Sequence, residues 1–312
     1  MGLAIPLVTI LGTTAVGKTT FAAHLASALD TEIISADSRQ VFRGMDIGTG
    51  KDLNEYLVNN KRIKAHLIDI SEPGTEYNVF QFQRDFGAAF KEILSKGKIS
   101  ILCGGTGLYI ESILSGYQLQ EVPNNEILRH ELEQLSDNEL VAKLSSLRQL
   151  HNSTDILDRG RMVRAIEIEL HKKANIAQQP CFDFSNSLVF GIRFDRKTVR
   201  SRITDRLVQR LDEGMIEEVH QLMEDGISAE KIKWYGLEYK YVAMYILGEL
   251  GKGEMFNLLN TAIHQFAKRQ MTWFRRMEKN GILIHWLEGE DGLENNLQKA
   301  LKLIEQEKQG AQ

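Results

Sequence analysis

The 312-residue sequence has little cysteine and proline and no long apolar run. Its two cysteines, Cys103 and Cys181, lie far apart and outside any CxxC pair, which argues against a disulfide framework and a structural zinc site. None of the eight histidines forms an HxxxH pair. No stretch approaches the about 18 consecutive apolar residues of a membrane-spanning helix. The four prolines leave no long structureless linker.

The apolar N-terminal segment, residues 1–14, has no Lys or Arg before its apolar run, unlike a secretory signal. Together with the few cysteines, this predicts a cytoplasmic protein that does not associate with membranes.

Charge of one sign is also missing, since 42 acidic and 38 basic side chains give a net charge of −4. This excludes a uniformly basic surface. The charges are nevertheless segregated along the chain. Residues 193–210 hold seven basic and two acidic side chains, 264–279 hold five and one, and 159–173 hold five and two. Residues 211–230 hold seven acids and no Lys or Arg. Binding to phosphates depends on local charge, so a nucleic-acid partner remains compatible with the total.

Short apolar runs alternate with helical patterns over much of the chain. Strands are predicted at Ile5–Leu11, Glu32–Ser35, Ala65–Ile70, Ile99–Cys103, Leu188–Phe194 and Ile282–Leu287. Helices are predicted at Lys18–Leu29, Val79–Leu94, Lys197–Leu211 and Met255–Met277. This order predicts an α/β fold with a mainly parallel sheet flanked by helices.

Residues 118–177 have a different character, with few β-rich runs. Helices are expected at Glu126–Leu135, Asp137–Leu150 and Asp158–Lys172. Because strand patterns resume afterwards, we expect a small all-helical insertion within a core formed by residues 1–117 and 178–312.

A phosphate-binding loop follows the first predicted strand and opens a helix. Its sequence, Gly12-Thr13-Thr14-Ala15-Val16-Gly17-Lys18-Thr19, fits GxxxxGK[ST]. The glycines let backbone N–H groups turn inward, and the helix N-terminus adds partial positive charge. Lys18 is expected to neutralise phosphate oxygens, and the Thr19 hydroxyl to ligate Mg²⁺. The motif predicts a phosphate binder but does not say which bond is broken.

Polar side chains follow three other predicted strands. Asp37 follows the second strand and is interpreted as a general base, a metal ligand or a helix N-cap. Asp69 is either a Walker B carboxylate or a solubilising residue at a strand end. Thr106, in the second glycine-rich turn Gly104–Gly107, either contacts phosphate or substrate or belongs to a tight turn.

Four blocks together resemble the bacterial tRNA dimethylallyltransferase family. They are GTTAVGKT at 12–19, ADSRQVFRGMDIGTGK at 36–51, GGTGLY at 104–109 and AKRQMTWFR at 267–275. Their order and spacing match the family, and the last block is the most specific. The resemblance implies a P-loop NTPase-like core and transfer of a dimethylallyl group from dimethylallyl diphosphate to N6 of the adenosine immediately 3′ of the tRNA anticodon. Pyrophosphate would be released, and the loop at 12–19 would bind the diphosphate with Mg²⁺.

The resemblance also implies roles for individual residues. Asp37 would be the general base, Arg206 and Lys18 would act on the diphosphate, and Thr106 would lie where the flipped base enters. The implied tRNA-binding residues are Asp37, Ser38, Arg39, Gln40, Thr106, Arg129, Gly160, Arg161, Met162, Val163, Arg164 and Lys240. The helical insertion is expected to contact the anticodon stem, and the enzyme to be a monomer.

The chain departs from the family pattern at two of these places. Gly160 stands where a glutamine is usual, and Gly236-Leu237-Glu238-Tyr239-Lys240 stands where many members read IGYK. Phe42 and Asp52 replace a common tyrosine and proline.

Other interpretations of the basic and aromatic residues, and of the enzyme class, remain. Arg161 and Arg164 would also suit a solvated helix face, and Trp273 and Phe274 are more typical of a core than of base stacking. A small-molecule kinase and a nucleic-acid-binding NTPase are the rival functions. The kinase leaves the second and fourth blocks without a role, and the NTPase would normally show a clearer Walker B carboxylate.

Overall fold

The computed structural model describes residues 5–119, 121–148, 158–174, 184 and 186–310. The chain divides into two compact units, a sheet unit of residues 1–116 and 183–312 and an insertion unit of residues 117–182. The sequence predicted these boundaries at 117/118 and 177/178. No helix within the described ranges combines the length and apolar character that a bilayer crossing requires.

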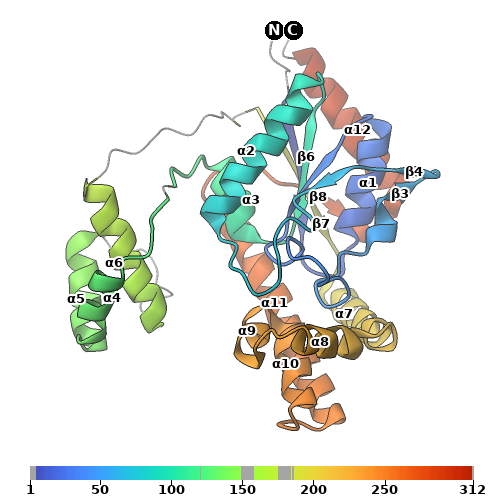
Figure 1. Ribbon diagram of the computed structural model, residues 1–312. Coiled ribbons are helices and arrows are strands. Elements are labelled where there is room, and N and C mark those ends of the chain that lie inside the picture. The colour runs from blue at the N-terminus through green and yellow to red at the C-terminus, as the bar shows by residue number, and fades with distance from the viewer. Residues whose placement is uncertain (1–4, 120, 149–157, 175–183, 185, 311–312) are drawn as a thin grey trace. The chain divides into compact units, whose positions relative to one another are not determined.

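Six parallel strands form the central sheet in the order β5-β2-β6-β1-β7-β8 (Figure 1). Their bounds are β1 Leu7–Gly12, β2 Ile33–Ala36, β5 Ala65–His66, β6 Ser100–Gly104, β7 Leu188–Arg193 and β8 His285–Glu288. All six residues of β1 are buried, because a central parallel strand is covered on both faces. The parallel α/β core predicted from the sequence is therefore confirmed.

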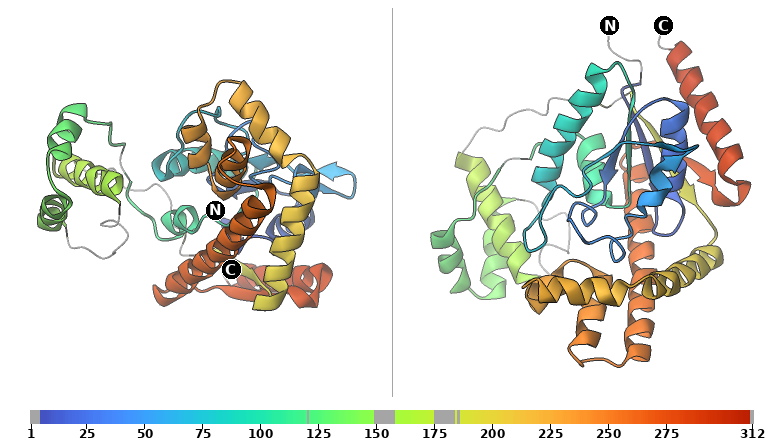
Figure 2. Two further views of the ribbon diagram at one scale, coloured as in Figure 1. Left: turned by 90° about the horizontal axis from the view of Figure 1, so that it is seen from below. Right: turned by 45° about the vertical axis from the view of Figure 1, so that its right-hand side comes forward.

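Helices cover both faces of the sheet. Figures 1 and 2 show α1 (Lys18–Ala28) and α12 (Leu293–Gly310) on one side and α2 (Val79–Ser95) and α3 (Gly107–Leu114) on the other. The remaining helices of this unit are α7 Arg196–Asp212, α8 Met215–Glu224, α9 Ala229–Trp234, α10 Leu237–Ile246 and α11 Lys252–Lys279. The 28-residue α11 contacts α3, β1, α7 and α10, so it joins the sheet to the helices at its carboxyl edge.

Two predicted strands are shorter than expected. The strand predicted at Ala65–Ile70 is reduced to β5, because Leu67 and Asp69 adopt left-handed backbone angles with φ of 63° and 56°, which end regular pairing. The last strand begins only at His285. A small hairpin of β3 (Leu57–Val58) and β4 (Lys61–Arg62), after the 3₁₀ helix η1 (Leu53–Tyr56), had no sequence prediction.

The insertion unit contains α4 Glu126–Glu133, α5 Asp137–Leu147 and α6 Arg159–Ala174. Ser136 and Glu139 form a reciprocal capping box that starts α5. A separate small core fills the space between the helices and includes Leu132, Leu140, Leu144, Met162 and Ile166. This unit thus has an apolar core of its own.

Candidate active site

Three loops of the sheet unit meet at the carboxyl edge of the sheet. They follow β1, β2 and β6, and these strands are direct neighbours, with Gly104 in register with both Leu11 and Ala36. Ligands of open α/β sheets bind outside the carboxyl ends of the strands. The phosphate loop, the loop at 37–40 and the loop at 105–106 therefore border one site.

The backbone of the phosphate loop depends on close approach and on left-handed residues. A Cβ on Gly12 would lie 2.7 Å from the carbonyl oxygen of Ile192, so only glycine fits there. Gly17 and Ala15 have φ of 80° and 63°, and α1 begins directly after Gly17. The first N–H groups of a helix have no intrahelical acceptor, and these face the loop.

Lys18 is half-buried at the start of α1 and lines the cavity next to the loop. Its Nζ donates to the Thr13 carbonyl oxygen at 2.7 Å. Burial lowers the pKa of Lys18 to about 8, with a smaller lowering by Arg206 and opposing contributions from Cys103, Asp37 and Glu55. The ammonium group therefore lacks a full set of anionic partners, as expected of a lysine that a phosphate completes.

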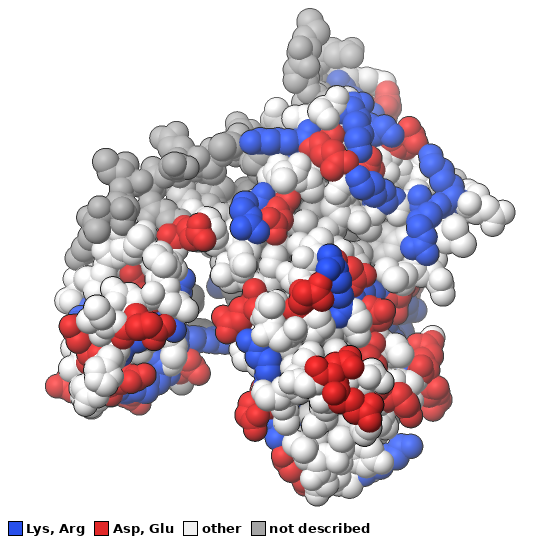
Figure 3. Space-filling model, viewed as in Figure 1, with Lys and Arg blue, Asp and Glu red and all other residues white. Residues whose placement is uncertain are grey.

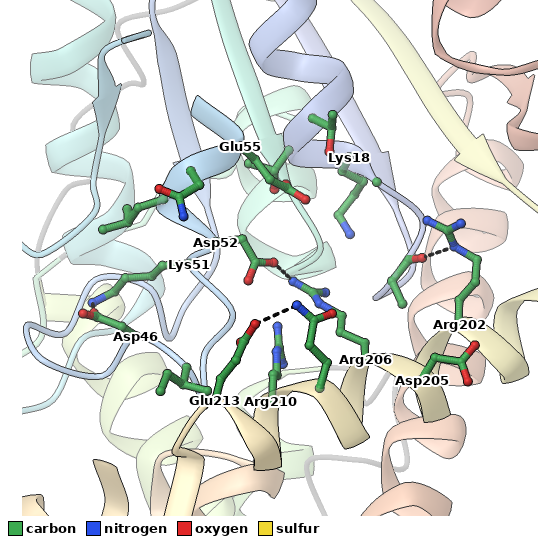
Figure 4. A pocket seen from close by; sticks show the side chains of 18 residues that line it. Lys18, Asp46, Lys51, Asp52, Glu55, Arg202, Asp205, Arg206, Arg210 and Glu213 are labelled. Carbon is green, nitrogen blue, oxygen red and sulfur yellow. Dashed lines mark hydrogen bonds and ion pairs between the residues drawn. The ribbon is translucent and has the colours of Figure 1, made fainter. Parts of the chain in front are cut away.

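A cavity of about 770 Å³ opens beside this lysine. Its walls come from residues 15–20, 46–55 and 202–213 (Figure 4). Asp52 and Glu55 contribute carboxylates to it. Burial and the neighbouring Asp52 raise the pKa of Glu55, while a hydrogen bond with Thr20 opposes that shift.

Helix α7 contributes three arginines to this cavity, at intervals of four residues. Arg202 donates from Nε to the Ala15 carbonyl at 2.7 Å, and Arg206 forms an ion pair with Asp52. Arg210 lies one turn further along the same face (Figure 4). The helix thus presents a row of guanidinium groups opposite Lys18.

Asp37 and Thr106 lie together on the neighbouring loops. Asp37 Oδ1 accepts the N–H groups of Arg39 at 2.8 Å and Gln40 at 3.4 Å, which caps a turn. No helix begins at this described segment, so the helix N-cap interpretation is wrong. Thr106 Oγ1 accepts the Ser38 N–H at 3.1 Å. Among the described residues, no hydrogen bond involves Oδ2 of Asp37, so one carboxylate oxygen is available for other chemistry.

Gln270 of α11 connects the two glycine-rich loops. Its Oε1 accepts the Thr14 N–H at 2.9 Å, and its Nε2 donates to the Gly105 carbonyl at 2.9 Å. A Cβ on Gly105 would lie 2.5 Å from that Nε2, so the missing side chain of Gly105 makes the contact possible. One buried amide therefore fixes the phosphate loop relative to the loop that carries Thr106.

Glu218 of α8 fixes the far wall of the cavity. Its carboxylate accepts the N–H groups of Asp46, Ile47 and Gly48 at 2.8, 2.7 and 3.0 Å, and also the Tyr239 hydroxyl at 2.7 Å. Figure 3 shows acidic side chains gathered where α8 lies, yet this acid faces inward and holds a loop.

Comparisons with known proteins agree along most of the chain. Residues 40–277 match the family model described as IPP transferase, and residues 5–72 match the one described as isopentenyl transferase. The chain belongs to the IPP transferase family. A tRNA dimethylallyltransferase 2 of Bacteroides fragilis is 54% identical over 93% of this chain and 95% of its own length. One from Phocaeicola vulgatus is 54% identical over 96% and 97%.

Solved structures support the same assignment. A full-length tRNA isopentenylpyrophosphate transferase from Bacillus halodurans has a TM-score of 0.70 at 30% identity, covering 98% of this chain and 97% of that one. A tRNA isopentenylpyrophosphate transferase from Staphylococcus epidermidis has a TM-score of 0.68 at 32% identity, covering 96% and 98%.

The AKRQMTWF block of this IPP transferase family member lies in α11, and its side chains support the loops of the site. Besides Gln270, it contributes Phe274, which is fully buried. The Trp273 ring packs on Gly107, where a Cβ would lie 2.5 Å from the ring. The Arg276 guanidinium lies 4.0 Å from the centroid of the same Trp273 ring. Arg276 in turn pairs with the buried Glu111 at 2.5 Å. The aromatic residues thus support the helix start after Thr106, in line with the core interpretation.

Several predicted tRNA-binding residues of the sheet unit border Asp37. The Arg39 guanidinium lies 4.8 Å from the exposed ring of Trp234, and burial lowers its pKa. Gln40 is buried and donates from Nε2 to the Gly50 carbonyl at 2.9 Å, so its amide holds a loop. Lys240 is exposed on α10.

In the insertion unit, Arg129 and Arg164 both bind Glu167. Arg129 donates to both carboxylate oxygens at 2.8 and 2.9 Å, and Arg164 donates at 2.9 Å. Burial would raise the pKa of Glu167, but the hydrogen bonds from Arg129, the Asn125 N–H and Arg164 hold it at about 2.

The segment 160–163 is divided between surface and core. Gly160 and Arg161 are exposed, and Val163 is half-buried. Met162 has only 1% of its surface exposed and packs in the core of the insertion unit. The Met162 side chain faces the other helices, so the predicted contact of Met162 with tRNA would have to use its backbone and stays a prediction.

Asp69 does not act as a Walker B residue. Its carboxylate pairs with Lys51, which is completely buried and also contacts Asp46 at 2.5 Å and the Phe42 carbonyl at 2.6 Å. Asp69 does not line the cavity beside Lys18. It closes the loop 41–51 instead.

Sequence reasoning missed several residues of the site, among them Arg202, Arg210, Glu218, Gln270 and the cavity carboxylate Glu55. The spacing of four residues between Arg202, Arg206 and Arg210 was a usable signal, as was the position of Gln270 inside the most specific block. Glu218 gave no signal, because it stands among six other acids in residues 211–230.

Proposed function

We propose that the protein transfers a dimethylallyl group from dimethylallyl diphosphate to N6 of the adenosine immediately 3′ of the anticodon in tRNA. The observation that carries this proposal is the shared edge of the sheet. The cavity that Lys18 and the arginines of α7 line lies beside the phosphate loop, close to Asp37 and Thr106, and Gln270 links the two glycine-rich loops.

In this reaction the adenosine amine attacks the prenyl carbon, and the carbon–oxygen bond to the diphosphate breaks with its electron pair on the diphosphate. The phosphate-loop N–H groups, Lys18 and Arg206 would stabilise the charge gained by the leaving group. Asp37 would take the proton from the amine through Oδ2 while Oδ1 remains in its turn. Thr106 would orient the base that is flipped out of the anticodon loop.

The cavity also suits Mg²⁺ by the chemistry of its donors. Thr19 supplies a hydroxyl, and Asp52 and Glu55 supply carboxylates, all hard oxygen ligands of the kind that Mg²⁺ prefers. When bound, Mg²⁺ would offset negative charge on the diphosphate.

The tRNA would be held by both units. We infer contacts at Ser38, Arg39, Gln40 and Lys240 of the sheet unit, and at Arg161 and neighbouring basic residues of the insertion unit with the anticodon stem. We propose that the enzyme acts as a monomer on tRNA.

The decisive experiment mixes the protein, Mg²⁺, unmodified tRNA and dimethylallyl diphosphate and measures prenylated adenosine by mass spectrometry. We expect product only with all components present. Turnover of ATP on a small metabolite, without prenylated tRNA, would favour the kinase instead. ATP hydrolysis stimulated by tRNA, without transfer, would favour the NTPase.

A further inference from the structure

Arg210 lies deep in the cavity beside Arg206. Only 8% of its surface is exposed, and its side chain points from α7 into the cavity (Figure 4). A Cβ on Gly50 would lie 1.5 Å from Arg210 Nη2 and 2.9 Å from Arg206 Nη2. The two guanidinium groups therefore meet over the same point of the loop.

The Arg210 guanidinium is incompletely paired. Its buried Nε has no hydrogen-bond partner among the described residues. Within the ranges that the structure describes, the only carboxylate paired with the Arg210 guanidinium is that of Glu238. The distance from Arg210 Nη1 to Glu238 Oε1 is 3.8 Å, which exceeds hydrogen-bond distance. Burial and the neighbouring Arg206 both lower the pKa of Arg210. A buried cation with an unused donor is costly unless a ligand completes it.

We propose that Arg210 is a second guanidinium ligand of the diphosphate, acting beside Arg206, and that Glu238 is the positioning residue that holds Arg210 before the diphosphate binds. This inference rests on the proposed function. A planar guanidinium binds phosphate oxygens through parallel N–H groups. Two guanidinium groups would stabilise the negative charge that accumulates on the diphosphate as the carbon–oxygen bond breaks.

The cavity decides in favour of the diphosphate over a phosphate of the tRNA backbone. Arg210 lines the same space as Gly17, Lys18 and Thr19 of the phosphate loop. An exposed, fully solvated arginine would suit the tRNA backbone better than this enclosed one.

Glu238 has the features of a positioning residue. It stands in the segment where this chain departs from the IGYK pattern, and its side chain is 20% exposed. Burial raises its pKa, and Arg210 and Arg206 oppose that shift. The two arginines thus oppose the protonation that burial favours, and the arriving diphosphate would compete with the Glu238 carboxylate for Arg210.

The test measures binding of inorganic pyrophosphate with Mg²⁺ to the full chain by isothermal titration calorimetry. R210M keeps the length of the side chain and removes its charge, and we expect about tenfold weaker binding or more, as for loss of a charge-assisted hydrogen bond. R206M should also weaken binding. R200M changes the exposed Arg200 of the same helix and should bind pyrophosphate like the unaltered protein. The affinity for tRNA should be unchanged in all of these variants.

Two further variants separate ligand binding from folding. In R210M/E238Q no unpaired carboxylate is left, and we expect binding to stay weak; recovery to within about twofold would overturn the proposal. E238Q alone should bind pyrophosphate several-fold more tightly, since the anion no longer competes with the carboxylate. Unchanged or weaker binding by E238Q would refute the role given to Glu238.

The outcomes also distinguish this inference from the proposed function. Normal binding by R210M together with weak binding by R206M overturns the role of Arg210 and leaves the donor site intact. Normal binding by both variants overturns the donor site itself, and with it this inference.

Discussion

The arginines of the insertion unit and those of α7 face opposite situations. Arg129 and Arg164 converge on Glu167, whose side chain is 1% exposed and whose pKa is held at about 2. Arg202, Arg206 and Arg210 border a cavity of about 770 Å³. Arg202 donates to a backbone carbonyl, Arg206 pairs with the partly exposed Asp52, and Arg210 has Glu238 only at 3.8 Å, beyond hydrogen-bond distance.

This difference separates residues that hold the fold from residues that await a ligand. In the insertion unit Arg129 and Arg164 share the buried carboxylate of Glu167, so loss of that carboxylate should first affect stability. Around the cavity, acidic side chains are as numerous as basic ones, but Arg210 lacks a carboxylate within hydrogen-bond distance among the described residues. Loss of these arginines should therefore first affect binding and catalysis. A count of basic residues, which gave an excess in both segments, cannot distinguish the two.

The largest expected effect tests the cavity side of this comparison. Asp37→Asn keeps the Oδ1 acceptor for Arg39 and Gln40 but removes the base, so the transfer rate should fall about 1,000-fold. Single-turnover kinetics would measure it. Pyrophosphate affinity and the thermal midpoint should stay unchanged; a loss of Mg²⁺-dependent pyrophosphate binding would make Asp37 a metal ligand instead.

The next effect tests the insertion side. Glu167→Gln leaves two arginines without their buried carboxylate and should destabilise the insertion unit by about 3 kcal/mol. Hydrogen exchange over residues 121–148 and 158–174 would report it. Glu169→Gln, a neighbour on α6 that pairs with Arg148 at 3.6 Å, is the matched control and should have a smaller effect.

The pH dependence of the same unit has a defined sign. Since the folded-state pKa of Glu167, about 2, lies below its ordinary value of 4.5, its contribution is present above pH 4.5 and is lost as the pH falls toward 2. If Glu167→Gln instead left stability unchanged and weakened tRNA binding, Arg129 and Arg164 would belong with the ligand-binding residues.

A smaller effect on catalysis is expected at the bridge between the loops. Gln270→Leu leaves the Thr14 N–H and the Gly105 carbonyl unpaired and should lower kcat/KM about 30-fold, or about 2 kcal/mol. Gln265→Leu, on an exposed position of the same helix, should be neutral. If Gln270→Leu instead lowers only the thermal midpoint, the bridge belongs with the residues that hold the fold.

The smallest effect concerns Lys18. Because its pKa is about 8 in the free protein, its charge is lost as the pH rises through that value, and pyrophosphate affinity should fall about fivefold between pH 8 and pH 9. Calorimetry at several pH values would measure this. A flat profile would mean that Lys18 does not contact the anion.

The features that the sequence predicted well are coded locally. The apolar run of β1 and the motif after it place the phosphate loop without any distant information, and the capping box at Ser136 marks the start of α5. Asp37 and Thr106 were brought to the same edge by the general rule for parallel strands.

The remaining features depend on distant partners. The end of β5 is set by left-handed backbone at Leu67 and Asp69, which no run of apolar letters reveals. Met162 is buried because α6 turns that face toward α4 and α5. Glu218 differs from the surrounding acids only in the loop that it meets, and that loop is 170 residues away in the sequence.

The bridge made by Gln270 has a consequence for the order in which the protein is synthesised. Thr14 emerges from the ribosome 256 residues before the amide that fixes it, and Gly105 emerges 165 residues before. At about 5–20 residues per second, the two loops wait roughly ten seconds or more for α11. A nascent chain that ends before α11 can therefore contain the whole GxxxxGK[ST] motif and still lack a fixed site.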